Sequence, residues 1–599
     1  MISSAAWIAK GKAAHHPTSY KVDDNELERV AKLANVHFED AKAQFERAQR
    51  VAAGWHDGKE IGEDEGWEDD DKEEVKEDEA MDAEDEDQDT VTKPAAKEDP
   101  NDLSRYNLDN YDNDDNEATT MGPFSNIKGL QYYRNNDEDP YITLKEDPVE
   151  AQEEREELEV MPTDNMIITA KTEDEVSLLE AYVYIHEDAN LYVHHDLMLP
   201  SFPLCLEWLD YKPSGGGEGS ADQNSNVGAK GNFIAVGTMD PEIEIWSMDV
   251  VEGLFPDAIL GQKDITEQLN APKGTGKKKR KQAKERVPNA NYHVDAVLGL
   301  SWNKLARNLL ASASADSTVK LWDLSKPADE NGGTNALRSF GDLHTDKVQS
   351  VAWDTSNSSR GSIGQPARLL SGSYDKTICV FDSRSPSDVV RASVSSDLES
   401  VRWNPWREHN FFVSMEDGLV QSFDARMLTK EKSASAIFTL SAHDGACTSL
   451  DISPHIPGCI VTGGTDKLVK LWNVEGDSSF EVNAANQDIN WRPSSLSMVA
   501  SRNLDAGKIF SVQFSPDDPL TLVAAGSRGV LRVWDALANV GARKTFGDRL
   551  RAMPNDPAKT AIRIDGNEPA RGDGVVSLAD ESDNESDDGG HGGDVAMEE

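Results

Sequence analysis

Short runs in which apolar residues alternate with small or polar ones recur through the middle and C-terminal part of the chain. In "LLASASADSTVKLWDL" one such run ends at Ser314 and the next begins at Thr318, with small residues and Asp316 between them. Runs rich in β-branched and aromatic residues predict β-strands, and the intervening small residues, Gly and Asp predict hairpin turns. The pattern therefore predicts an all-β fold built from many short strands.

The strands belong to a repeated unit that is marked by two aromatic series. The second series follows a turn acid by six residues, in the pairs Asp240–Trp246, Asp316–Trp322, Asp375–Phe381, Asp417–Phe423 and Asp466–Trp472, and Arg528 replaces the acid before Trp534. The first series lies upstream and consists of Trp208, Trp302, Trp353, Trp403 and Phe514, with Ile452 in the same place in one copy. In four copies the two series are 20 residues apart, which predicts three short strands in each unit.

Three histidines, His293, His344 and His443, lie nine residues before an upstream aromatic position. An unpaired buried polar group is costly, so we expect each histidine to form a buried hydrogen-bonded set with the turn acid and the strand-end ring of its unit. Recurrence in unit after unit favours a structural role over a catalytic one. The doublet His194–His195 is predicted to be a degenerate counterpart of these histidines rather than a metal site.

These motifs resemble WD repeats, whose units assemble as the blades of a β-propeller. The resemblance spans roughly Asp164 to Asp535, with six clear copies and a degenerate one, "NMIITAKTEDEVSLLEAYVYI", that lacks a first strand. It implies a seven-bladed ring in which the degenerate blade is completed by strand exchange between the chain ends. "DPYITLKED" is an alternative source of the missing strand, or else it binds another protein.

Charge divides the rest of the chain. The formal net charge is −50, and acids are concentrated in residues 60–89 and in the C-terminal "ADESDNESDDGGHGGDVAMEE". Such blocks repel themselves and bury little apolar surface, so we expect them to be disordered. The predicted domains are an N-terminal segment with an amphipathic helix (1–56), an acidic tract (57–100), an extended docking segment (101–160), the propeller (161–541, with a basic insertion at 251–291) and an acidic tail (542–599).

The N-terminal helix is predicted from apolar residues at helical spacing, among them Leu27, Val30, Leu33, Phe38 and Phe45. Two interpretations remain open. The helix packs on the propeller of its own chain, or it docks on another protein as an amphipathic peptide.

Several classes of protein are disfavoured. The chain has neither a long apolar run nor the apolar core of a signal peptide, so we expect no membrane association and no secretion. The scattered cysteines, Cys205, Cys379, Cys447 and Cys459, indicate buried reduced thiols and no zinc site. Neither a hydrolase, metalloprotease nor phosphate-loop motif is present, which predicts a protein without catalytic activity, cofactor or small-molecule substrate.

One segment opposes the global charge. Its basic residues are Lys273, Lys277, Lys278, Lys279, Arg280, Lys281, Lys284 and Arg286. Such a run indicates a nuclear import signal bound by an import receptor, which we favour, or an arm that contacts RNA phosphates; failing both, it is a solvated loop. In the acidic tail, Ser582 and Ser586 precede acids and are predicted phosphorylation sites.

The order of motifs along the chain resembles the periodic tryptophan protein family of WD-repeat ribosome assembly factors. The resemblance rests on "MISSAAWIAKG", "YNLDNYD", "PTDNMIITAKTEDE", "YVHHDLMLPSFPLCLEWLDY" and "NFIAVGTMDPEIEIWSMDV". It implies a nuclear and nucleolar scaffold that binds pre-ribosomal RNA and assembly factors within precursors of the large (60S) subunit and is needed for processing of large-subunit rRNA. Two alternatives are a chromatin- or histone-binding regulator at ribosomal genes and a substrate adaptor of a ubiquitin ligase.

Overall fold

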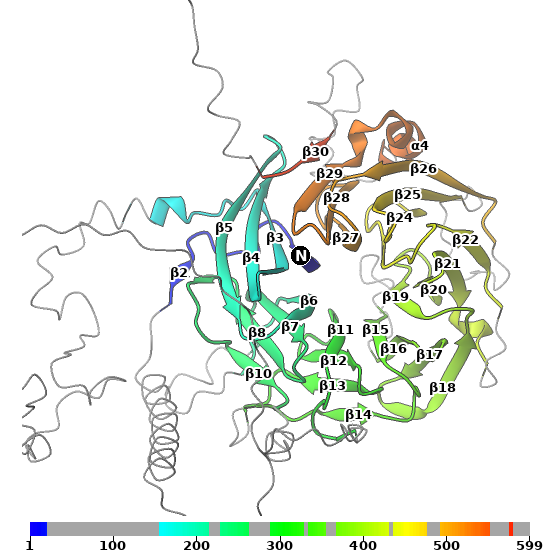
Figure 1. Cartoon of the computed structure of the whole chain (residues 1–599), viewed down its shortest axis with the longest axis horizontal. Helices are drawn as coiled ribbons and strands as arrows, with labels where there is room; N and C mark the ends of the chain where they lie inside the picture. Colours follow the sequence, from blue (N-terminus) through cyan, green and yellow to red (C-terminus); the bar gives the residue numbers. More distant parts are fainter. Residues whose placement is uncertain are drawn as a thin grey trace, which may run out of the picture. The chain divides into compact units, whose positions relative to one another are not determined.

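Seven four-stranded antiparallel sheets surround a central channel in the computed structural model (Figure 1). The structure describes residues 1–20, 152, 155–214, 228–262, 288–328, 333–354, 367–429, 435–475, 492–551 and 574–578. Within these ranges the fold is a seven-bladed β-propeller with WD repeats, as predicted.

Each blade is numbered here in chain order, and its strands run from the channel outward. They are β1 (Ile2–Ile8), β3 (Asn165–Glu173), β4 (Val176–Ile185) and β5 (Asn190–Leu199) in blade 1; β6 (Pro203–Leu209), β7 (Phe233–Thr238), β8 (Ile243–Ser247) and β10 (Ala258–Leu260) in blade 2; β11 (Val297–Trp302), β12 (Leu309–Ser314), β13 (Val319–Asp323) and β14 (Arg338–Phe340) in blade 3; and β15 (Val348–Trp353), β16 (Arg368–Ser373), β17 (Thr377–Asp382) and β18 (Ser385–Ser393) in blade 4.

The remaining blades follow the same order. They are β19 (Leu398–Trp403), β20 (Asn410–Met415), β21 (Leu419–Asp424) and β22 (Phe438–Ser441) in blade 5; β23 (Ser449–Ile452), β24 (Cys459–Gly463), β25 (Leu468–Glu475) and β26 (Ser495–Asn503) in blade 6; and β27 (Ile509–Phe514), β28 (Thr521–Gly526), β29 (Leu531–Asp535) and β30 (Val575–Val576) in blade 7. Outside the blades lie β2 (Thr18–Ser19) beside β9 (Val250–Val251), η4 (Ala425–Met427), η5 (Ala536–Ala538) and α4 (Val540–Arg551).

The hydrophobic core is divided into layers, one between each pair of neighbouring blades. Seven clusters of buried side chains are present among the described residues, and each combines residues of two adjacent sheets. The upstream aromatic series belongs to these layers, because Trp302, Trp353 and Trp403 end the inner strands β11, β15 and β19. Each blade is thus stabilised mainly by its neighbours, which makes closure of the ring important.

The missing strand of blade 1 comes from the start of the chain. β1 pairs antiparallel with β3, with Ala5 opposite Thr169 and Ile8 opposite Met166. It also packs against blade 7, because Ile2, Ala5 and Trp7 share a core cluster with residues of β28 and β29. Strand supply from a chain end is therefore confirmed, whereas "DPYITLKED" lies outside the described residues.

Three predicted boundaries differ from the structure. Residues 2–8, which we expected in a separate N-terminal segment, are part of the propeller. The expected insertion at 251–291 includes the outer strand β10 of blade 2, and the expected disordered tail at 542–599 includes most of α4 and the outer strand β30 of blade 7. The outer strands β10 and β30 were not predicted because they have only three and two residues, too few to show a period. In α4 the buried Ala542, Phe546 and Leu550 do follow a helical spacing, which our sequence reasoning missed. The predicted N-terminal helix and acidic tracts lie outside the described residues.

Candidate functional site

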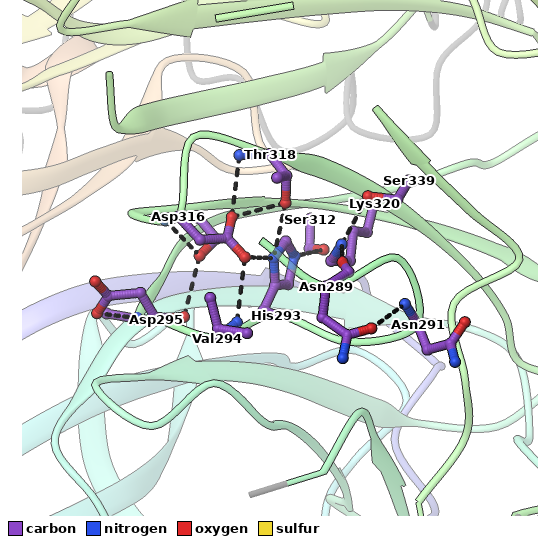
Figure 2. A network of polar contacts seen from close by, with 12 residues as sticks. Asn289, Asn291, His293, Val294, Asp295, Ser312, Asp316, Thr318, Lys320 and Ser339 are labelled. Carbon is purple, nitrogen blue, oxygen red and sulfur yellow. Dashed lines mark hydrogen bonds and ion pairs between the residues drawn. The ribbon is translucent and has the colours of Figure 1, made fainter. Parts of the chain in front are cut away.

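A buried hydrogen-bonded chain crosses blade 3 from the turn Asp316 to the strand-end Trp322. Figure 2 shows its part from Asp316 through His293 to Ser312. His293 Nδ1 lies 3.0 Å from Asp316 Oδ2, and its Nε2 lies 2.7 Å from Ser312 Oγ. Trp322 Nε1 donates to the same Ser312 oxygen at 2.8 Å. The side chains of His293 and Asp316 are completely buried, as are Ser312 and Trp322. The predicted set is confirmed in this blade, with a serine added between the histidine and the tryptophan.

The arrangement of Ser312, His293 and Asp316 resembles the triad of serine hydrolases, but it does not present a nucleophile to a substrate. In a hydrolase the serine oxygen faces an open cleft and is free to attack a carbonyl. Here Ser312 has no exposed surface and accepts the indole N–H of Trp322. The triad-like geometry therefore joins the segment before β11 to strands β12 and β13 of the same blade.

In blades 3 to 6 the turn acid also stabilises the hairpin turn itself. Asp316 Oδ1 accepts the backbone N–H of Thr318 at 3.0 Å, across Ser317, which has a φ of 64°. The left-handed conformation is unfavourable for a residue with a side chain, and an Asp side chain that bonds two residues onward stabilises such turns. Equivalent turns follow Asp375, Asp417 and Asp466. This requirement explains why Asp417 is present without a histidine partner.

Blades 6 and 4 repeat the hydrogen-bonded chain with one informative difference. In blade 6, Trp472 Nε1 donates to Thr462 Oγ1 at 2.9 Å, and His443 lies 2.8 Å from that oxygen and 2.9 Å from Asp466. In blade 4, His344 lies 2.8 Å from Ser371 and 3.2 Å from Asp375, but Phe381 offers no donor. The hydroxyl residue stands ten positions before the strand-end ring in all three blades, a spacing that our sequence reasoning missed.

The other blades lack the complete set. Ser395 donates to Asp417 at 3.0 Å in blade 5, in place of a histidine. In blade 7, Asp505 and Arg528 form a 3.5 Å ion pair, in which the acid occupies the histidine position of the repeat and the base occupies the position of the turn acid. In blade 2, Trp246 donates to Glu244 at 3.0 Å, and Asp240 lies in a turn that Thr238 stabilises.

The prediction for the His194–His195 doublet was wrong in its detail. Both residues lie in β5, the outer strand of blade 1, and their Nδ1 atoms are 2.7 Å apart. The position nine residues before Trp208 is occupied by Leu199, so the doublet does not replace a repeat histidine. Burial and the neighbouring His194 lower the pKa of His195 to about 4.

Hydrogen bonding and charge give the three repeat histidines different protonation. Burial lowers the pKa of His293 and His443, against the opposing effect of Asp316 and Asp466, and both histidines have a lysine nearby, Lys320 or Lys470. For His344 burial also opposes the charge, but hydrogen bonding to Asp375 prevails and the pKa rises to about 9. The lysine position of blade 4 is Cys379. Because Phe381 offers no indole donor, the Ser371 oxygen is available to accept a hydrogen bond from the His344 Nε2–H.

This difference predicts a pH dependence that is specific to blade 4. The folded-state pKa of His344, about 9, lies above the ordinary value of 6.5, so its contribution to stability is complete below pH 6.5 and lost as pH rises through 9. The loss amounts to roughly 2–3 kcal/mol. Urea unfolding of the wild type and of His344→Gln between pH 6.5 and 9 measures this loss. The difference between their free energies of unfolding should shrink as the pH rises. His443→Gln is the control, because its lowered pKa predicts no such trend over this range; the same trend in both variants would contradict the assignment.

The inner strands are joined around the channel by side chains that accept backbone N–H groups of the next blade. Glu207 accepts from Trp302 at 3.0 Å, Ser301 from Trp353 at 3.1 Å, and Asp451 from Phe514 at 2.8 Å. Glu207 also borders a cavity of about 310 Å³ that is lined by all seven inner strands. Burial raises the pKa of Glu207 and Asp451. These acids are therefore part of the ring's structure.

The remaining predicted site residues are not placed by the structure. The basic loop, Lys273 to Arg286, lies outside the described residues, in the connection between β10 of blade 2 and β11 of blade 3. Ser582 and Ser586 also lie outside them. Cys379, Cys447 and Cys459 are buried, as expected, and Cys205 is partly exposed. In the described part of the chain, no helix is both long and apolar enough to cross a membrane.

Comparison with known proteins agrees with this geometry. Residues 288–323, 336–382, 434–473 and 500–535 match the family described as WD domain, G-beta repeat. A protein of Schizosaccharomyces pombe, called an uncharacterized WD repeat-containing protein, is 38% identical over 92% of this chain and 92% of its own. Periodic tryptophan protein 1 of Saccharomyces cerevisiae is 34% identical over 94% of this chain and 93% of its own. The chain belongs to the periodic tryptophan protein 1 family.

The similarity is broader than the WD repeats alone. The four matched ranges correspond to blades 3, 4, 6 and 7, and the first three of these hold the histidine-centred sets. Propellers of this family are generally non-catalytic scaffolds. A shorter similarity, 22% identity over 42% of this chain and 54% of the relative, links the chain to histone acetyltransferase type B subunit 2 of Candida glabrata.

Proposed function

We propose that this protein is a non-catalytic scaffold in ribosome biogenesis. It joins nucleolar precursors of the large (60S) subunit and is needed for maturation of large-subunit rRNA. The observation that carries the proposal is the similarity to periodic tryptophan protein 1 over 94% of the chain. The sequence resemblance to that family implies a role in large-subunit assembly. A relationship of that extent includes sequence outside the repeats.

The architecture supports a scaffold. The histidine-centred sets of blades 3, 4 and 6 are buried inside the sheets and hydrogen-bond one another. A ring of seven blades offers two faces and a rim to different partners, and long charged extensions suit binding to several neighbours. Its proposed partners are pre-ribosomal RNA and large-subunit assembly factors, with an import receptor delivering the chain to the nucleus and nucleolus.

Sedimentation of nuclear extracts tests the proposal. The tagged full-length protein is expected to migrate with large-subunit precursors, and its depletion is expected to cause precursors of large-subunit rRNA to accumulate. Treatment with RNase should release it from the fast-sedimenting fraction, whereas DNase should not. Sedimentation with cullin complexes, or normal rRNA processing after depletion, would overturn the proposal.

A chromatin role is the second candidate. It is favoured by the similarity to histone acetyltransferase type B subunit 2 over 42% of the chain. In the same fractionation, this function predicts DNase-sensitive association with chromatin and binding to histones. The coverage is less than half of that for periodic tryptophan protein 1, so we rank it below ribosome assembly.

Neutral substitutions in the basic loop separate its two proposed roles. If Lys277 to Lys281 form an import signal, the substituted protein should stay in the cytoplasm and bind RNA normally in vitro, and a fused import signal should restore its association with pre-ribosomes. If they contact phosphates, RNA affinity should fall for every sequence, and the log–log salt dependence should flatten by about 0.7–0.9 per lost contact. Normal nuclear entry and normal RNA binding would contradict both.

A further inference from the structure

Two histidines in the N-terminal segment lie against the residues that lead into blade 1. His15 and His16 follow β1, and Glu159 and Val160 precede β3. The backbone N–H of Val160 donates to the His15 carbonyl at 3.0 Å, and the His15 ring Nδ1 lies 3.0 Å from the Val160 carbonyl. These contacts join positions 145 residues apart in the sequence.

The second contact fixes the tautomer of His15. A carbonyl oxygen only accepts hydrogen bonds, so Nδ1 must carry the proton, and in the neutral ring the lone pair is then on Nε2. Nε2 lies 2.8 Å from Glu159 Oε1, which is itself an acceptor. Two acceptors at that distance repel unless a proton or a metal ion is between them. A carbonyl partner on the far nitrogen is also the usual support of a metal-binding histidine.

His16 supplies a third group at the same place. Its ring centroid is 4.4 Å from that of His15, and its Nδ1 is enclosed without a hydrogen-bond partner among the described residues. One potential ligand atom from each of His15, His16 and Glu159 lies within 4.8 Å of the others. Ligand atoms around a tetrahedral zinc ion are about 3.3–3.6 Å apart, given bond lengths of about 2.0–2.2 Å. His15 Nε2 and Glu159 Oε1 would therefore move apart from 2.8 Å, which needs only side-chain rotations.

The backbone beneath Glu159 is held independently of these three residues. His194, in β5 of blade 1, lies with Nε2 3.0 Å from the carbonyl oxygen of Leu158. The cluster is accessible to solvent, because the side chains of His15 and Glu159 are 45% and 34% exposed. Water can therefore complete the coordination of a bound ion.

We propose that His15, His16 and Glu159 bind a divalent transition-metal ion, with Zn²⁺ as the best chemical fit. Two imidazoles and a carboxylate are ligands that zinc accepts readily, with water in the open position. His15 and His16 follow β1, whereas Glu159 precedes β3. A bound ion would therefore connect the N-terminal segment to the residues that lead into β3. The site is independent of any ribosomal function.

Isothermal titration of the metal-stripped full-length protein with Zn²⁺ tests this assignment. We expect one tight site in the wild type, and a loss of affinity of about tenfold or more in His16→Gln and Glu159→Gln. The matched controls are His186→Gln, a histidine in the loop after β4, and Glu156→Gln, an exposed acid three residues before Glu159; both should bind as the wild type does. Zn²⁺ should raise the melting temperature of the wild type and the controls only.

Weak binding of Zn²⁺ to the acidic tracts is distinguished by its stoichiometry and by its persistence in every variant. Apo-state melting curves show whether His16→Gln and Glu159→Gln fold normally, and Co²⁺ absorption bands in the wild type that vanish in both variants report ligation directly. Absence of a tight site in the wild type, or equal affinity in all four variants, would overturn the proposal. The contact between His15 and Glu159 would then be a hydrogen bond and not a metal site.

Discussion

Deletion of residues 2–8 is expected to open the propeller and abolish its cooperative unfolding. The segment supplies the innermost strand of blade 1, and Ile2, Trp7 and Ile8 are at most 7% exposed. Burial of such side chains is worth about 1.5–3 kcal/mol each, and the net stability of a domain is only about 5–15 kcal/mol. The loss also leaves β3 and the core between blades 7 and 1 open to water.

Urea unfolding and limited proteolysis measure this effect. A deletion of residues 574–578 is the matched control, because β30 is an outer strand whose two residues are only partly buried; it should shift the midpoint slightly. A synthetic peptide of residues 1–20 should restore protease resistance to the 2–8 deletion variant. Wild-type unfolding of that variant would contradict the assigned role of β1.

Replacement of Trp322 by Ala is expected to destabilise the protein by about 3–5 kcal/mol through loss of buried volume. Trp322→Phe keeps most of the ring and isolates the hydrogen bond to Ser312. Trp534→Phe is the matched control, since Trp534 is equally buried but its Nε1 has no hydrogen-bond partner among the described residues. Ala524 occupies the place that Ser312 holds in blade 3.

The two Phe variants should therefore differ by about 1–3 kcal/mol, the cost of leaving the hydroxyl and imidazole network of blade 3 incomplete. The difference is read from urea midpoints at constant slope. Equal destabilisation by the two substitutions would show that ring volume alone matters and that the Ser312 contact contributes little.

The sequence was most informative where a repeated polar residue marks a turn. The Asp–Trp spacing placed the three inner strands of blades 2 to 7, and His293, His344 and His443 were correctly paired with Asp316, Asp375 and Asp466. Such positions are constrained locally, because the acid must cap the turn two residues onward. Because this constraint acts within a few residues, it fixes the spacing between the acid and the following strand, and that spacing can be read from the sequence.

Features that depend on distant residues were not predictable in the same way. Ser312 and Thr462 occur among other small residues, and only the folded blade shows that they bridge His and Trp. The outer strand β26 is mostly exposed, so it lacks an apolar pattern. The pairing of β1 with β3, like the contact of His15 with Val160, joins positions so far apart that no local periodicity indicates it.

The position of β1 also has a consequence for the timing of synthesis. The backbone N–H of Ala5 donates to Ser511 Oγ, across a separation of 506 residues. At a translation rate of about 5–20 residues per second, roughly 25–100 s pass between synthesis of the two partners. During that interval the apolar strand Ile2–Ile8 has emerged, but blade 7 does not yet exist to cover it. Strand β1 is therefore made long before it can be fully buried, and the nascent chain needs shielding from aggregation during that interval.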